Sequence, residues 1–209
     1  MRRPRRMGYT SWFCVAGLCV AHVAWGAATP PGTAPLEYTR ATLEQARAIV
    51  GSDRTHNDKL ATLSDLLKKF LDTDTMGRDA LDKHWAQFSA PQQKEFLMLF
   101  RELFQRTYVQ KLLLFEKPDF GYVGETVTDG KARVDTKIIT PRDEFAVTYQ
   151  LRQDGERWLA TDIKIEDMSL TMNFRRQLDR LLSKSSPEDV LGRMRKKYGP
   201  NGAGGDEDL

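Results

Sequence analysis

The sequence predicts an α+β protein in which a helical layer packs on one face of a three- to four-stranded antiparallel sheet, with a cavity between them. Apolar residues recur at helical spacing over most of residues 36–115, and they alternate with polar residues between residues 126 and 165. Helical spacing then returns after residue 170. Helices, a strand meander and further helices in this order are typical of the α+β class.

Residues 1–28 have the features of a secretory signal peptide. Four arginines within the first six residues precede an apolar stretch over residues 12–24 and a run of small residues. This order of charge, apolar stretch and small-residue cleavage site is typical of exported proteins. The apolar stretch is shorter than the ~20 residues of a spanning helix, so we expect cleavage and no permanent membrane span.

Removing this leader changes the composition that bears on function. The 209-residue chain has 32 Lys plus Arg, 29 Asp plus Glu and two Cys. Loss of the four arginines lowers the basic count to 28 and the net charge from +3 to −1, and Cys14 and Cys19 are lost as well. The mature chain therefore has no thiol chemistry or disulfide, and its charge gives no argument for nucleic-acid binding.

The mature chain reads as one domain with two irregular ends. Residues 29–35 are Pro-rich and residues 199–209 are Gly-rich and acidic, so both are expected to be disordered. Residues 36–198 form the single predicted domain.

Helices are predicted over residues 36–50, 55–71, 76–88 and 90–115. The last follows Ser89, a good N-cap with Gln92 three residues later. From Phe96 to Phe115, 13 of 20 residues are apolar or Tyr, whereas a core-facing stripe needs about nine. This helix is thus apolar on more than one face.

Strands and closing helices follow. Turn signals at residues 129–130, 141–144 and 154–155 separate segments of period-two alternation. The strands have one apolar face each, so the sheet is expected to be covered on one side. Helices are predicted over residues 170–182 and after the start signal at residues 185–188.

Polar clusters with a recognisable chemistry are not evident. His56 and His84 have no set of partners at metal-ligand spacing, and Asp72 and Asp74 are best explained as helix caps. Asp162 and Glu166 alternate with apolar residues and share a solvated face. We therefore predict no metal, no cofactor and no enzymatic activity.

The surplus of apolar side chains is the feature that points to a function. These residues either form an ordinary core or line a cleft for an acyl chain, for which each buried CH₂ contributes about 0.8 kcal/mol. The candidate cavity-lining set is Phe96, Leu99, Phe100, Leu103, Phe104, Tyr108, Leu112, Val147, Tyr149, Trp158, Ile163 and Ile165.

Ordered segments of residues 36–198 resemble the MlaC / toluene-tolerance family of periplasmic phospholipid-binding proteins. The segments are residues 72–76 (DTDTM), 80–81, 84–85 and 89–96 (SAPQQKEF), followed by Phe100, Leu103, Phe104 and residues 107–108. In the predicted sheet and the helix after it they are residues 147–152 (VTYQLR), the turn at 154–155, Trp158, residues 162–166 with 169–170, and residues 173–178 (NFRRQL). The chain departs from the family at residues 167–169 (DMS), where the family usually has Gly before the aliphatic residue.

The resemblance implies a soluble periplasmic shuttle that maintains outer-membrane lipid asymmetry. Its ligand would be a phospholipid with two acyl chains or a related long-chain lipid. Its partners would be an outer-membrane lipoprotein complex and the substrate-binding domain of an inner-membrane ABC transporter, with no nucleic acid.

Two other interpretations stay open from the residues. The first is a small nuclear-transport-factor-like enzyme that uses Asp162 or Glu166 in an apolar pocket. The second is an exported adaptor with a solid core and no ligand.

Overall fold

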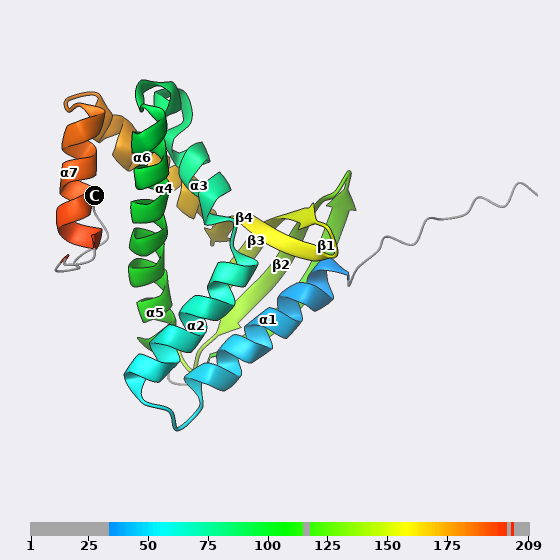
Figure 1. Cartoon of the computed structure of the whole chain (residues 1–209). Coiled ribbons are helices and arrows are strands. Elements are labelled where there is room, and N and C mark those ends of the chain that lie inside the picture. The colour runs from blue at the N-terminus through cyan, green and yellow to red at the C-terminus, as the bar shows by residue number, and fades with distance from the viewer. Residues whose placement is uncertain (1–33, 115–117, 200–201, 203–209) are drawn as a thin grey trace, which may run out of the picture. The chain divides into compact units, whose positions relative to one another are not determined.

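The computed structural model describes residues 34–114, 118–199 and 202 (Figure 1). The predicted signal peptide, most of the lead-in and most of the acidic tail lie outside the described residues, so those assignments stay predictions.

The structure describes seven α-helices, and they lie in the segments where the spacing of apolar residues predicts helices. They are α1 (Pro35–Val50), α2 (His56–Phe70), α3 (Thr73–Leu81), α4 (Ala90–Phe104), α5 (Gln110–Leu114), α6 (Leu170–Leu182) and α7 (Pro187–Tyr198). The predicted helix over residues 76–88 is α3 followed by a 3₁₀-helix, η1 (Asp82–Gln87). The long helix over residues 90–115 contains one π-helical turn, η2 (Gln105–Val109), between α4 and α5. None of the described helices has the length and apolar character that crossing a bilayer requires.

The sheet has five antiparallel strands in sequential order, not the predicted three or four. The strands are β1 (Asp119–Thr128), β2 (Lys131–Ile139), β3 (Glu144–Asp154), β4 (Arg157–Ile165) and β5 (Met168–Ser169). The first half of β1 was missed because a bulge at Val123 interrupts its alternation. The two residues of β5 are too few for any periodic signal.

Helices cover one face of the sheet, as the alternation predicted. In β2, Ala132, Val134 and Thr136 are buried, whereas Arg133 and Lys131 are exposed. α1 packs against β1 and β2, and α2, α3 and α6 pack against β4. α4 packs on α3 and α7. Figure 1 shows α1 and α2 across the sheet and α4 beside α7.

The link between α2 and α3 joins the helices to the sheet. Leu71 forms a parallel bridge with Ala160 of β4, and the Asp72 N–H donates to the Ala160 carbonyl (2.9 Å). The Asp72 carboxylate caps α3 by accepting from the Thr75 N–H (3.0 Å), and it also accepts from Arg152 Nε of β3 (2.7 Å). Partial burial would raise the pKa of Asp72, but the hydrogen bonds from Thr75 and Arg152 outweigh it and hold the pKa below its ordinary value.

We predict that Asp72→Asn lowers the free energy of unfolding by about 1–2 kcal/mol at pH 7, because the charge-assisted bond to Arg152 is lost while the cap is kept. Because the folded-state pKa is lowered, the ionised Asp72 contributes stability at pH values above the unfolded pKa of about 3.9. This contribution is lost as the pH falls through the folded-state pKa. In urea titrations, the difference from wild type should therefore begin to shrink near pH 4 and disappear only below the lowered folded-state pKa. Asp65→Asn, at an exposed carboxylate, is the control and should change the free energy of unfolding little. A loss of unfolding free energy in Asp72→Asn that does not depend on pH would contradict the prediction.

Candidate functional site

The five candidate residues of α4 form the centre of the helical core. Their side chains are at most 2% exposed; they are Phe96, Leu99, Phe100, Leu103 and Phe104. The Phe100 ring meets Phe174 of α6 edge-on with centroids 5.2 Å apart, and a Cβ on Gly77 of α3 would lie 3.0 Å from Phe100 and Leu97 atoms. These residues therefore face α3, α6 and α7, with glycine at position 77 permitting close approach.

Tyr108 and Leu112 lie further along the same helical rod. The Tyr108 ring is 4.7 Å from Phe104 and 6.2 Å from Phe174, in edge contact with the latter, and burial raises the pKa of Tyr108 to about 12. Leu112 is half-buried in α5. Tyr108 thus continues the aromatic row of α4 through the π-helical turn.

The candidate residues of the sheet share its covered face. Val147, Tyr149 and Trp158 are buried, and Ile163 and Ile165 are half-buried. The strand register pairs Tyr149 with Ile163 and Val147 with Ile165. The Tyr149 ring meets Phe70 of α2 edge-on at 5.6 Å, and its burial raises the pKa of its hydroxyl.

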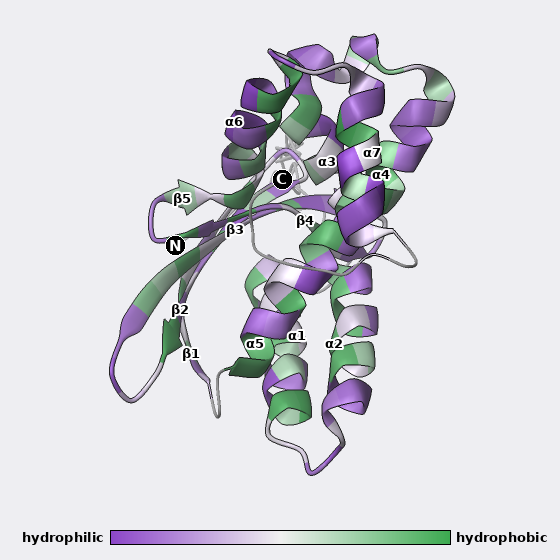
Figure 2. Cartoon of the chain, turned by 90° about the vertical axis from the view of Figure 1, so that its left-hand side faces the viewer, coloured by the Kyte–Doolittle hydropathy of each residue, from purple (hydrophilic) through white to green (hydrophobic). Residues whose placement is uncertain are grey.

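One continuous apolar cluster contains eleven of the twelve candidates. Eight are buried within it and Tyr108, Ile163 and Ile165 pack against it. α4 joins this cluster through α3, α6 and α7, and β3 joins it through Phe70 of α2, so the helices and the sheet share one core. Figure 2 shows the chain coloured by hydropathy, with hydrophobic and hydrophilic stretches alternating along α1 and α2.

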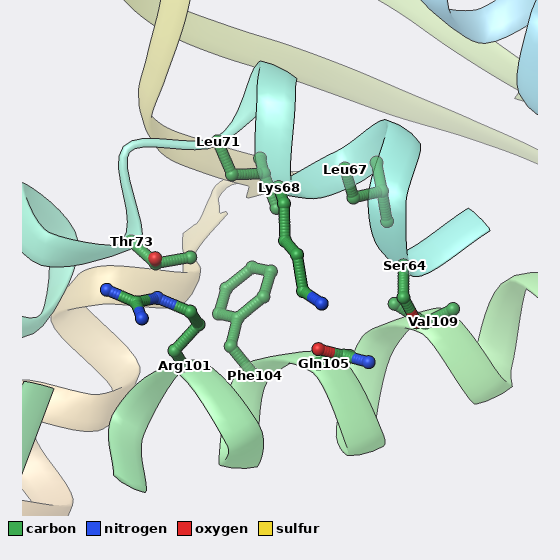
Figure 3. A pocket seen from close by; sticks show the side chains of 9 residues that line it. All are labelled: Ser64, Leu67, Lys68, Leu71, Thr73, Arg101, Phe104, Gln105 and Val109. Carbon is green, nitrogen blue, oxygen red and sulfur yellow. The ribbon is translucent and has the colours of Figure 1, made fainter. Parts of the chain in front are cut away.

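A second cluster lies at the other end of the rod. Val109 packs there with Ala46 and Val50 of α1 and Leu63 of α2, and Leu67 of α2 contacts both clusters. At this boundary a cavity of about 20 Å³, room for about one water molecule, separates α2 from α4 and η2. Figure 3 shows its lining side chains.

An open groove of about 1100 Å³ lies where β3, β4 and β5 meet the start of α6. Its apolar lining residues are Phe145, Ile165, Met168 and Met172, and Met168 and Met172 are 49% and 41% exposed. Phe145 and both methionines were not among the predicted site residues. The alternation of β3 placed Phe145 on the covered face, but its position at the strand end, where solvent reaches it, has no local sequence signal.

The Asp162 and Glu166 carboxylates accept hydrogen bonds from backbone N–H groups and do not face the apolar cluster. Asp162 pairs with Gln150 in the register, opposite in direction to Ile163, and accepts from the Thr171 N–H at the start of α6 (3.1 Å). Glu166 is exposed, adopts a left-handed conformation (φ 54°) and accepts from the Ala146 N–H (2.8 Å).

The described histidines and carboxylates form no group that would hold a metal ion. His84 is buried, and its Nε2 lies 2.8 Å from Asp179 Oδ1 of α6, which also accepts from Lys83 at 2.7 Å. His84 thus ties η1 to α6.

The fold is therefore of the α+β class, with helices on one face of a five-stranded antiparallel sheet and apolar side chains packed between them. The family model described as "MlaC protein" matches residues 38–196, and the chain belongs to this family. No curated protein matches the sequence.

Among solved structures, the chain is similar to a phospholipid-binding protein from Ralstonia solanacearum in complex with a phospholipid. The TM-score is 0.71 at 17% identity, over 78% of this chain and 96% of that one. At this identity the likeness shows a shared fold.

We predict that Phe100→Ala lowers the free energy of unfolding by about 3–5 kcal/mol, the cost of a large cavity in a close-packed core. Ile165→Ala, at the half-buried end of the sheet, should cost less than half as much because solvent already reaches that side chain. Urea denaturation measures both values. Equal losses would contradict the placement of Phe100 in the core and Ile165 at its edge.

Proposed function

We propose that the protein binds a phospholipid through its acyl chains in the apolar cluster between the helices and the sheet, with the head group toward solvent. The observation that carries the proposal is the family match over residues 38–196 together with a shared fold whose solved example is phospholipid-bound. The apolar cluster supplies the non-directional contacts that acyl chains need. The twelve candidate residues are proposed to line the bound chains.

A binding role also agrees with the hydrogen bonds of the two carboxylates that the enzyme alternative would use. Asp162 and Glu166 are both engaged by backbone N–H groups, so neither supports the enzyme alternative. We propose that no chemical step and no cofactor are involved. A related long-chain lipid would satisfy the same apolar contacts.

We further propose that the protein works in the periplasm as a shuttle. Its partners would be an outer-membrane lipoprotein complex and the substrate-binding domain of an inner-membrane ABC transporter, and its role would be to maintain outer-membrane lipid asymmetry. The predicted leader of residues 1–28 supports export. Intact-mass measurement of the protein from a periplasmic extract should show loss of about these residues.

We predict that protein purified without detergent yields phospholipid on solvent extraction and mass spectrometry, and that the delipidated protein takes up labelled phospholipid from vesicles. A protein that carries no lipid and takes none up would leave the adaptor interpretation standing and refute the proposal.

We predict that Val147→Trp lowers lipid uptake at least fivefold, because the larger side chain occupies the space of an acyl chain on the covered face. Ala146→Trp is the matched control, since Ala146 is the adjacent, exposed residue on the other face of β3. Thermal unfolding measures the cost of overpacking the closed cluster, about 1–3 kcal/mol for the buried Val147. A Val147→Trp variant that stays folded and still takes up lipid at the wild-type rate would contradict the placement of the acyl chains at this residue.

A further inference from the structure

The small cavity between α2, α4 and η2, described above and called the seam from here on, has an apolar floor and charged residues at its edges. Its apolar lining comes from Leu67, Leu71, Phe104 and Val109. Lys68 of α2 and Arg101 of α4 line the same seam from its two sides, and in Figure 3 both long side chains extend along it on either side of the Phe104 ring. The charged side chains that line the seam are both cations.

Each cation keeps hydrogen-bond donors for a further partner. Lys68 Nζ is 3.5 Å from Asp65 Oδ1, and its side chain is 49% exposed. Arg101 donates one nitrogen to Asp74 Oδ1 at 2.7 Å, and its side chain is 41% exposed. A guanidinium has five N–H donors and an ammonium three, so these surface pairs leave donors that an anion can engage.

Gln105 adds a polar group inside the seam. Its side-chain oxygen is buried and has no hydrogen-bond partner in the described part of the chain. Leaving such an atom unpaired costs free energy. Gln105 is also the first residue of the π-helical turn, and such turns occur frequently at functional sites. Burial without a partner is therefore unfavourable for the Gln105 side-chain oxygen. A hydrogen bond from a polar ligand atom, or from water in an opened seam, would remove this cost.

We propose that this seam is where a phospholipid enters, with its phosphate between Lys68 and Arg101 and its acyl chains passing over Phe104 into the apolar cluster. The inference rests on the proposed function and adds a phosphate-binding position to it. Charge complementarity between two cations and a phosphodiester carries the assignment, together with the apolar floor directly beneath them.

The open groove at β4 and β5 is the competing entrance, and its charges are less suitable. Lys164 and Arg176 line it, but so do Asp162, Glu166 and Asp167. Three carboxylates beside two cations give a net negative edge, which repels a phosphate. The seam is the smaller opening, but no carboxylate lines it, because Asp65 and Asp74, which pair with its two cations, lie outside its lining.

The test compares uptake of two labelled lipids from neutral phosphatidylcholine vesicles: phosphatidylglycerol, and diacylglycerol, which lacks the phosphate. The seam variant Lys68→Gln/Arg101→Gln should take up phosphatidylglycerol at least fivefold more slowly than wild type and diacylglycerol at the wild-type rate. The groove variant Lys164→Gln/Arg176→Gln and the control Lys94→Gln, at an exposed cation of α4 outside the seam, should behave as wild type with both lipids.

A groove variant that loses uptake while the seam variant keeps it would overturn the assignment, and so would a seam variant that loses both lipids equally. Binding of inorganic phosphate that Lys68→Gln/Arg101→Gln abolishes, with no change in phosphatidylglycerol uptake, would identify a free-anion site and overturn the lipid assignment. If the double variant unfolds, Lys68→Gln and Arg101→Gln alone should each show part of the phosphatidylglycerol defect. A wild-type protein that takes up neither lipid refutes the proposed function itself.

Discussion

The junction at Leu71 and Asp72 joins the helical layer to the sheet at the start of α3, the helix on which α4 and α6 pack. Leu71 bridges to Ala160 of β4, and the Asp72 carboxylate joins the start of α3 to Arg152 of β3. α3 in turn carries α4, through Gly77, and α6. A shift at this link would move α3 relative to the strands and α4 with it, because α4 packs on α3.

The apolar excess of the long helix has a physical explanation in this arrangement. Its first part faces α3, α6 and α7 with Phe96, Phe100 and Phe104, and its last part faces α1 and α2 with Val109. Two sets of neighbours on different sides require apolar residues on more than one face. The composition of the helix is thus satisfied by helix packing alone, and the family match and the shared fold carry the proposal of a lipid ligand.

Periodicity made most of the fold predictable, because helices and strands that bury one face repeat their apolar residues at fixed spacing. Local cap signals also worked: Asp72 begins α3, and Ser89 with Gln92 begins α4. The π-helical turn, the bulge of β1 and the two residues of β5 were not predictable, since each is set by tertiary packing.

The candidate site was predictable only as a set of apolar residues. Alternation placed Val147, Tyr149 and Ile165 correctly on one face of the sheet. The direction in which α4 turns its aromatic residues depends on α6 and α7, some 70 to 100 residues later in the chain, and no local pattern records it. The same holds for Lys68 and Arg101, which lie on separate helices and meet only in the fold.

A close-packed apolar cluster is what an unloaded carrier of the proposed kind requires. Exposed apolar surface of acyl-chain size would promote association of the protein with itself or with membranes. Burying a dozen carbons contributes about 10 kcal/mol, which is available to separate side chains that pack against each other without ligand. Such separation costs least where two clusters meet, and here they meet at Leu67, beside Gln105, whose buried oxygen already opposes the closed state. The boundary between the clusters is therefore the place where binding energy is most readily converted into opening.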